Sequence, residues 1–293
     1  MASQKGLGKG LGALLGDFTE EPLEKSAYQL LPIYKVEPNP DQPRQDFDEE
    51  ELQALADSIT VHGIIQPLTV REMPNGYYQI IAGERRWRAA RMANLSDVPA
   101  VIIEADDKKA MELALIENLQ REDLKPLEEA NGYKMLMDNF QVPIYNYIRR
   151  LVVSHEDAED VLQEVFIRVY RNLDQFRGES SLSTWIYRIA TNESLRLLNT
   201  RKDEEAIPAE EVQEELIGKL KASDYIDYEN ELAVKFQEAI LSLPEKQRLI
   251  FNLRYYDELD YEEISRILDS KVDTLKVNYH YAKEKIKEYI LNR

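Results

Sequence analysis

The sequence pattern of this 293-residue chain changes abruptly at residue 140. Before that point, short apolar runs bounded by Gly and Pro alternate with segments of helical spacing. After it, the apolar residues follow only the three- and four-residue spacing of helices. A strand-and-helix half followed by an all-helical half indicates separate domains. The pattern predicts a flexible arm (1–27), an α+β domain (28–140), a helical domain (141–202), an acidic linker (203–231) and a second helical domain (232–293).

The same pattern predicts the elements of each half. In the first half it indicates strands over 30–36 and 98–105, a hairpin around Pro74-Asn75-Gly76, and helices over 48–63, 83–93, 107–120 and 126–140. In the second half it indicates helices over 144–152, 156–173, 183–200, 232–242, 245–256, 260–268 and 272–291. The change at residue 140 falls inside a helical stretch, so residues 133–140 can supply the start of the next helix. Whether this join is natural or engineered stays open.

The net charge of −18 argues against a nucleic-acid-binding protein until its distribution is considered. Residues 203–231 hold eleven acidic residues against two lysines, which is half of the excess. That segment is either a solvated tether or a strap that mimics DNA. The flanking helical segments can still present local basic faces to phosphates. The chain has no cysteine and no apolar run of about 18 residues, so we expect no membrane span and a cytoplasmic, nucleoid-associated protein.

The motif Ala82-Gly83-Glu84-Arg85-Arg86 stands between an apolar strand and a helix. The first N–H groups of a helix and its positive dipole end favour anions, and arginine forks suit phosphate oxygens. Alone, such a motif is usually an ordinary helix start. Three further polar segments favour a nucleotide pocket, and they contain Gln42 and Arg44, Gly63 and Gln66, and Glu117 and Asn118.

In order and spacing, these motifs resemble the ParB family of chromosome-partitioning proteins over about residues 4–140, and the opening KGLGKGLGALL is similar to that family's N-terminal arm. The resemblance implies binding of CTP with Mg²⁺, an ion that shares hard oxygen ligands with phosphates. It implies nucleotide contacts from Gln42, Arg44, Gly63, Gln66, Gly83, Arg85 and Arg86, places Glu84, Glu117 and Asn118 near the metal, and gives Lys5 and Lys9 a contact with a ParA-type ATPase.

The resemblance also implies slow CTP hydrolysis and self-association of the N-terminal half, so enzymatic activity stays open. A related kinase activity is a further alternative. In ParB proteins this domain is followed by a helix-turn-helix module that reads a centromere-like site, and then by a dimerisation domain. Neither follows Phe140 in this chain. We therefore do not expect site-specific loading or a complete sliding clamp.

Two helices of the second half carry polar faces beside apolar rows. In residues 156–173, Asp157, Asp160 and Glu164 are spaced to share an outer face, which is either a solvated surface or a docking surface for a basic partner helix. The helix over 183–200 has Ser183 as its expected cap. Its inward residues are Trp185, Ile186 and Ile189, and its polar stripe is Arg188, Asn192, Arg196 and Asn199, closed by Arg201 and Lys202. Basic and amide side chains on one face suit phosphates and exposed bases.

The last two helices have the pattern of a helix-turn-helix. Asp260 and Glu263 form a capping box, and Asp269-Ser270-Lys271 is the expected turn. In the second helix we expect Leu275, Tyr279, Ala282, Ile286 and Ile290 to face inward and Lys276, His280, Lys283 and Lys287 to line the opposite face. A basic second helix suits the major groove of DNA, whereas an ordinary helical hairpin is the alternative.

Residues from about 140 to 293 resemble sigma factors of the extracytoplasmic-function group, through DAEDVLQEVFIRVYRNL, FRGESSLSTWIYRIATNESLRLLN, LSLPEKQRLIFNLRYY and LDYEEISRILDSKVDTLKVNYHYAKEKI. The resemblance implies an α+β ParB-like domain followed by two all-α sigma-factor domains. It implies contacts with core RNA polymerase from Asp157, Asp160, Gln163 and Glu164, with the melted minus-ten element from Trp185, Arg188, Asn192 and Arg196, and with the minus-thirty-five element from Lys276, His280 and Lys283.

The sequence therefore predicts a fusion that acts as a transcription initiation factor, binding core RNA polymerase and promoter DNA, with a CTP-binding domain attached. One alternative is a partition CTPase or clamp protein whose DNA-binding half has been replaced. Another is an adaptor that uses its helical half only to dimerise. The promoter sequence, any anti-sigma partner and the oligomeric state stay open.

Overall fold

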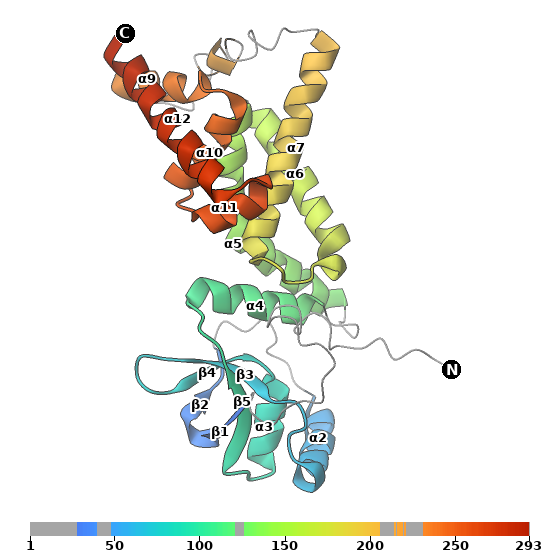
Figure 1. The fold of residues 1–293 in the computed structure, drawn as a ribbon. Helices are drawn as coiled ribbons and strands as arrows, with labels where there is room; N and C mark the ends of the chain where they lie inside the picture. Colours follow the sequence, from blue (N-terminus) through green and yellow to red (C-terminus); the bar gives the residue numbers. More distant parts are fainter. Residues whose placement is uncertain are drawn as a thin grey trace. The chain divides into compact units, whose positions relative to one another are not determined.

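The computed structural model describes residues 28–39, 48–120, 126–205 and 231–292, together with residues 214, 216–218 and 220. The chain forms two compact units (Figure 1). The first contains the described residues up to Leu136 together with Leu173–Ser181. The second contains Met137–Asn172 and the described residues from Leu182 onward. The first is a mixed α/β unit and the second is helical, as the sequence predicted.

The first unit is built on a five-stranded mixed sheet with the order β1-β5-β3-β4-β2. The strands are β1 (Gln29–Pro32), β2 (Val36–Glu37), β3 (Leu68–Glu72), β4 (Tyr78–Ala82) and β5 (Asp97–Ile102). β3 and β4 form the expected antiparallel hairpin, in which Gly76 has a φ of 78°. β1 is antiparallel to β5, whereas β2 is parallel to β4 and β3 is parallel to β5.

The prediction of one strand over 30–36 is wrong, because a 3₁₀ turn over Ile33–Lys35 interrupts it. The turn follows Pro32, which has no N–H to donate to a strand ladder. The two pieces pair with different partners, so β1 and β2 form opposite edges of the sheet. The ladder partners that decide this are far away in sequence, so a local apolar run could not reveal it.

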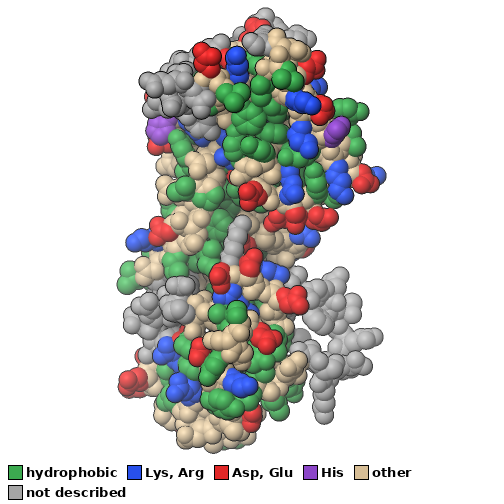
Figure 2. Space-filling model, turned by 90° about the vertical axis from the view of Figure 1, so that its left-hand side faces the viewer, with side chains coloured by type: hydrophobic (Ala, Val, Ile, Leu, Met, Phe, Trp, Pro, Cys, Tyr) green, Lys and Arg blue, Asp and Glu red, His purple; other side chains and the backbone are tan. Residues whose placement is uncertain are grey.

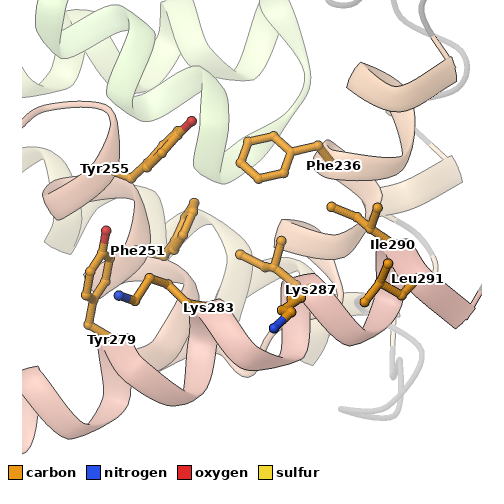
Figure 3. A pocket seen from close by; sticks show the side chains of 9 residues that line it. Phe236, Phe251, Tyr255, Tyr279, Lys283, Lys287, Ile290 and Leu291 are labelled. Atoms are coloured by element: carbon orange, nitrogen blue, oxygen red, sulfur yellow. The ribbon is translucent and has the colours of Figure 1, made fainter.

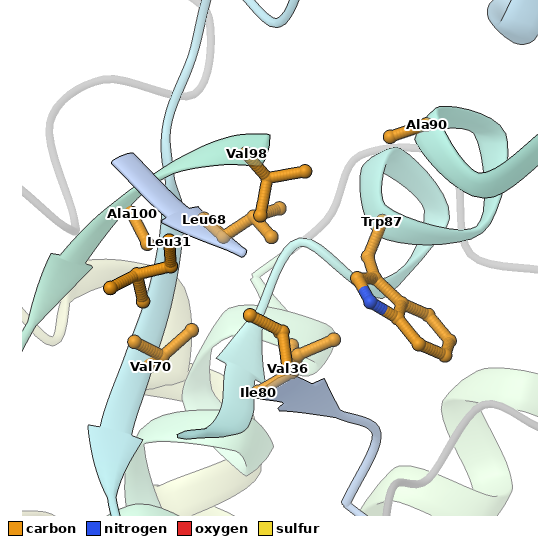
Figure 4. Close-up of a cluster of buried hydrophobic side chains, with 9 residues drawn as sticks. All are labelled: Leu31, Val36, Leu68, Val70, Ile80, Trp87, Ala90, Val98 and Ala100. Carbon is orange, nitrogen blue, oxygen red and sulfur yellow. The ribbon is translucent and has the colours of Figure 1, made fainter. Parts of the chain in front are cut away.

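Helices cover both faces of the sheet. One face carries the apolar cluster of Figure 4, to which α3 (Glu84–Met92) contributes Trp87 and Ala90. Its other members are Leu31, Val36, Leu68, Val70, Ile80, Val98 and Ala100. Neighbouring residues of a strand point to opposite faces, so Ile81 belongs to a different cluster, with Ala110 and Leu113 of α4 (Asp107–Leu119).

Helix α2 (Glu49–His62) packs on α3 and confirms the predicted helix in this segment. Asp48 caps its first turn by accepting hydrogen bonds from the backbone N–H groups of Glu50 and Glu51. Its end is set by Gly63, whose φ of 69° lies in the region that favours glycine. The cap and the stop thus place the 63–67 turn directly between α2 and β3.

Helix α5 (Pro126–Val152) is one continuous helix, although two helices were predicted, over 126–140 and 144–152. Pro143 lies inside it and cannot donate the usual backbone hydrogen bond. The buried residues nevertheless keep helical spacing across the proline, through Leu136, Phe140, Ile144, Tyr147, Ile148 and Leu151. Burial of this apolar row offsets the lost hydrogen bond. The division between the two units falls within this helix, after Leu136.

The second unit continues with α6 (His155–Asn172) and α7 (Leu182–Glu205), which pack on each other. The last group comprises α9 (Glu231–Leu241), α10 (Glu245–Tyr255), α11 (Tyr261–Leu268) and α12 (Val272–Asn292). The core of this group is Ala239, Ile240, Leu243, Phe251, Ala282 and Ile286. Helix α7 extends to Glu205, into the segment where we expected the linker to begin. Among the described residues, none of the helices is long and apolar enough to cross a membrane.

A buried ion pair joins the two groups of helices within the second unit. Arg150 of α5 donates to both carboxylate oxygens of Asp257, at 2.7 and 2.6 Å, and both side chains are less than a tenth exposed. The hydroxyl of Tyr187 in α7 donates to Asp257 Oδ1 at 3.0 Å. Burial, followed by the charge of Asp257, raises the pKa of Tyr187, which keeps its donor proton. The guanidinium of Arg150 also lies 4.7 Å from the ring centre of Tyr256.

Replacing Asp257 with Asn should lower the free energy of unfolding of the helical half by about 3 kcal/mol, because Arg150 would keep a buried, uncompensated charge. The measurement is urea unfolding of the full chain followed by circular dichroism at 222 nm. Adding Arg150→Met to this variant should recover part of the loss, because no buried charge then remains. Equal stability of Asp257→Asn and the wild type would contradict the assignment.

Candidate functional site

In the candidate phosphate-binding motif, residues 82–86, Gly83 lies between β4 and α3 and has a φ of 98°. A β-carbon at this position would lie 2.9 Å from Leu68 Cδ2 and 3.1 Å from Arg86 Cζ. The backbone conformation therefore favours glycine, and a β-carbon would also push the ends of these two side chains aside. Within the described part of the chain, no side chain caps the start of α3, and uncapped N–H groups at a helix start are the kind that can bind an anion.

Arg86 connects this helix start to the turn that follows α2. Its Nη1 atom donates to the backbone carbonyls of Gln66, at 2.6 Å, and Pro67, at 2.7 Å. Burial lowers the pKa of Arg86, and the nearby charge of Glu117 acts in the opposite direction. The structure thus brings together Arg86, the 63–67 turn and the end of α4, three regions that the sequence analysis assigned to one site. The contact with Gln66 is made through its backbone and not through its side chain.

The other two charged side chains of the motif have partners within the protein. Arg85 Nη2 lies 3.0 Å from Glu51 Oε2, which belongs to α2. Glu84 Oε1 accepts from Arg88 Nε at 2.9 Å and from Arg88 Nη2 at 2.6 Å. Any ligand that uses Arg85 or Glu84 must therefore compete with an existing ion pair.

The three expected metal ligands do not form a metal cage in the structure. Asn118 is buried and Glu117 is half-buried near the end of α4, whereas Glu84 is held by Arg88. Among the described residues there is no group of three or more His, Asp or Glu that could hold a metal ion by itself. Mg²⁺ takes many of its ligands from phosphate and water, and Glu117 and Asn118 each carry a side-chain oxygen that could add to them. Gln42, Arg44, Lys5 and Lys9 lie outside the described residues.

The acidic face of α6 differs from the prediction at one residue. Asp157 is not on the outer face: it is 8% exposed and its carboxylate pairs with both terminal nitrogens of Arg201. The reason is that Asp157 precedes Val161 by four residues and so continues the buried row. Asp160 and Gln163 are exposed as expected, and Glu164 is half-buried and accepts from Arg168 Nε at 3.1 Å.

Exposed carboxylates at Glu156 and Glu159 also lie on α6 and were missed by the sequence analysis. Glu159 Oε1 lies 3.6 Å from His155 Nε2. The spacing of these residues relative to Asp160 and Gln163 could have indicated their exposure, because i, i+3 and i+4 positions share a helix face.

The polar stripe of α7 is exposed at Arg188, Asn192 and Arg196, which confirms the predicted face. Arg196 Nε lies 3.3 Å from the buried carboxylate of Glu193. Trp185 is half-buried at the start of the helix. Two details differ: Arg201 is engaged by Asp157, and the helix begins at Leu182, so Ser183 lies in its first turn and is not the cap.

The helix-turn-helix is built as predicted. Glu263 N donates to Asp260 Oδ1 at 2.7 Å and Asp260 N donates to Glu263 Oε2 at 3.0 Å, which completes the capping box of α11. Asp269 ends α11 with a φ of 47° and occupies the turn position where glycine is common. This turn leads after two residues into α12.

The basic side chains of α12 flank the core instead of lying opposite to it. Lys276, Lys283 and Lys287 each follow a buried residue by one position, which is only 100° around the helix. Lys276, His280 and Lys283 are exposed, and Lys283 Nζ lies 5.1 Å from the ring centre of Tyr279. The face farthest from the core carries Val277, Tyr281 and Glu284.

Lys283 and Lys287 border an open groove of about 420 Å³ between α9, α10 and α12 (Figure 3). Its remaining lining is apolar or aromatic: Phe236, Phe251, Tyr255, Tyr279, Ile286, Ile290 and Leu291. Figure 2 shows hydrophobic side chains gathered beside Lys and Arg side chains on a face of the helical part. This groove could not be predicted from the sequence, because its walls come from three helices whose packing against one another is not encoded locally.

Comparisons with known proteins follow the same division of the chain. The model of the ParB N-terminal domain matches residues 18–119. The models of Sigma-70 region 2 and Sigma-70, region 4 match residues 136–204 and 233–286. The chromosome-partitioning protein ParB of Caulobacter vibrioides is 48% identical over 145 residues, which is 47% of this chain and 48% of that protein. The chain spans about half the length of the curated relatives it matches.

Two solved structures are similar to parts of this chain. C-terminally truncated ParB from Caulobacter crescentus, complexed with CTP-gamma-S, is 34% identical, with a TM-score of 0.31 and coverage of 74% of this chain and 93% of that chain. The sigma factor RpoE from Bartonella quintana, in complex with the anti-sigma factor NepR, is 18% identical, with a TM-score of 0.43 and coverage of 54% and 96%. From the three family matches, the chain is a fusion of a ParB N-terminal domain with the region 2 and region 4 domains of a sigma factor.

Proposed function

We propose that this protein is a transcription initiation factor that binds core RNA polymerase and recognises promoters, and that its ParB-like domain binds CTP with Mg²⁺. The observation that carries the proposal is that both helical domains expose a polar or basic face on an apolar scaffold. These faces are the stripe on α7 and the lysine row on α12. They belong to the segments that match sigma-70 regions 2 and 4.

The proposed polymerase contact centres on the exposed part of α6. Asp160 and Gln163 are available to a basic partner surface, and Glu164 contributes through its exposed edge. Asp157 acts differently, because its carboxylate holds Arg201 and so fastens α6 to the far part of α7. We assign it to positioning the two helices relative to each other.

The proposed DNA contacts divide between two helices. On α7, Arg188, Asn192 and Arg196 offer donors to the backbone and bases of a melted strand, next to Trp185, whose ring can stack on a base. On α12, Lys276, His280 and Lys283 offer cationic contacts to the duplex. Val277 and Tyr281 are exposed on the outer face and would contact DNA through apolar surface.

The proposed nucleotide site uses the start of α3. The backbone N–H groups of the first turn of α3, which follow Gly83, would donate to phosphate oxygens. Arg86 would move from the carbonyls of Gln66 and Pro67 toward the triphosphate. Glu117 and Asn118 would complete the ligands of a phosphate-bound Mg²⁺ ion, which supplies charge neutralisation. CTP is the nucleotide that the resemblance to ParB implies. Contact of Lys5 and Lys9 with a ParA-type ATPase and self-association of the N-terminal half remain predictions.

Replacing Trp185 with Ala should reduce the formation of open promoter complexes by about tenfold, because one base would lose its stacking partner. Binding of core polymerase should change less than about twofold, because the acidic α6 surface is intact. Permanganate footprinting measures the first quantity and fluorescence anisotropy with labelled protein measures the second. Tyr170→Ala on α6, which removes an exposed ring, is the matched control. Equal loss of both activities in the Trp185 variant would contradict its assignment.

Replacing Asp160 with Lys should weaken binding of core polymerase by about fivefold, because an attractive charge becomes a repulsive one at the docking surface. The affinity should be measured at two salt concentrations, because a surface charge effect decreases with ionic strength. Asp174→Lys makes the same charge change at an exposed residue outside α6. If both variants bind polymerase equally well, Asp160 has no part in docking.

Replacing Arg86 with Ala should weaken binding of CTP and Mg²⁺ by at least about tenfold, because a charge-assisted contact with the phosphates is lost. Isothermal titration calorimetry provides the affinity. Arg91→Ala removes an exposed arginine that packs over Trp87 on the same helix, and it should bind CTP as the wild type does. Unchanged affinity in Arg86→Ala would count against this site.

A further inference from the structure

The end of α4 holds a segment that is distant in sequence but belongs to the same compact unit. The side-chain amide of Gln120 donates to the backbone carbonyls of Leu173, at 3.1 Å, and Phe176, at 2.9 Å. Leu173 and Phe176 are both buried. Residues Leu173–Ser181 group with the N-terminal residues up to Leu136, although the helices on either side of them belong to the other unit. One side chain therefore fixes two backbone positions of this segment.

The same end of α4 takes part in the candidate phosphate site. Glu117 lies one helical turn before Gln120, and its charge acts on Arg86. Between them, Asn118 and Leu119 are buried. A β-carbon at Gly132 of α5 would come within 2.5 Å of Leu119 Cδ2, which shows how closely the two helices pack. Close packing at this end favours the transmission of a shift from Glu117 to Gln120.

The segment held by Gln120 leads directly into α7. The first residue of that helix, Leu182, follows Ser181, and Trp185 lies within its first turn. The proposed contact with melted DNA therefore begins a few residues after a segment whose carbonyls are bonded to the end of α4.

We propose that the carboxyl end of α4 transmits the state of the nucleotide site to residues 173–181, and that Gln120 is the positioning residue of this connection. The inference rests on the proposed binding of CTP. A triphosphate and its metal would change the charges beside Glu117 and withdraw Arg86 from its carbonyl partners. The protein would then have two arrangements of the α4 end, and the nucleotide site would bind CTP with a different affinity in each. Such a difference in affinity is what allows a ligand to shift the equilibrium between two conformations.

The coupling is reciprocal. If CTP alters the segment that enters α7, then a ligand that binds α7 must alter the affinity for CTP by the same factor. The connection would make promoter recognition by the sigma half sensitive to the nucleotide, through residues that contact neither the DNA nor the phosphates.

Hydrogen–deuterium exchange of the full chain, with and without CTP and Mg²⁺, tests the proposal. The Phe176 amide donates to Leu173 O at 3.0 Å and reports on the segment held by Gln120. Nucleotide should change the rate of exchange within 173–181 by roughly fivefold, the effect on local opening of strengthening or weakening one hydrogen bond. In Gln120→Leu this change should disappear, whereas the affinity for CTP should stay within about twofold, as expected for a residue outside the phosphate contacts.

Gln53→Leu is the matched control, because Gln53 is exposed on α2 and donates to the side chain of Asp57 on the same helix. It should keep the full exchange response. If Gln120→Leu does not fold, Gln120→Asn retains the amide on a side chain too short to reach both carbonyls and should also lose the response.

Titration calorimetry on the same samples separates two kinds of failure. If the wild type does not bind CTP, the proposed nucleotide function is wrong, and the proposed coupling to residues 173–181 is wrong as well. If the wild type binds CTP and exchange in 173–181 is unchanged, or if Gln120→Leu keeps the response, the coupling alone is overturned.

Discussion

The ion pair between Arg150 and Asp257 is the constraint on which the helical half depends. Two charges buried in low dielectric are tolerated when they are paired, and here two hydrogen bonds join them and the hydroxyl of Tyr187 donates a third to Asp257. Because its partners lie on α5, on α7 and in the loop after α10, the pair fixes where the last four helices lie against α7. The two faces proposed to contact DNA therefore have a defined separation in this state.

The candidate phosphate site follows a different physical logic. Its charged side chains already have partners: Arg85 pairs with Glu51, Glu84 with Arg88, and Arg86 bonds to two carbonyls. These contacts are partly exposed, so exchanging them for phosphate oxygens costs far less than breaking a buried pair. A site of this kind can exchange its contacts when a ligand binds. Because α4 packs closely against α5, a movement of the end of α4 would then be passed to the residues that it contacts.

Much of the fold could be predicted because it is encoded locally. Asp48 and Gly63 mark the ends of α2, and Asp260 with Glu263 marks the start of α11, by hydrogen bonds between residues close in sequence. The prediction for residues 30–36 was wrong because strand pairing is not local. The two halves of this apolar run form opposite edges of one sheet. At Pro143, burial of a continuous apolar row overcame the local preference against helix.

The site residues show the same division. Helical spacing placed Asp160, Arg188 and Asn192 correctly on exposed faces. Helical spacing gave the wrong position for Asp157, because this residue has the spacing of both the acidic row and the buried row. Its ion pair with Arg201, which lies 44 residues away, accompanies the buried position. The groove beside Lys283 and the bond from Gln120 to Phe176 could not be predicted, because they depend on which helices and loops pack together.

In vitro transcription tests the central claim, that the helical half directs polymerase to promoters. Purified core RNA polymerase and fragmented genomic DNA would be incubated with and without the full chain, and the 5′ ends of the transcripts would be sequenced. New transcripts should appear only with the protein and should begin at a fixed distance from a shared pair of sequence elements. The same set of 5′ ends with and without the protein would contradict it.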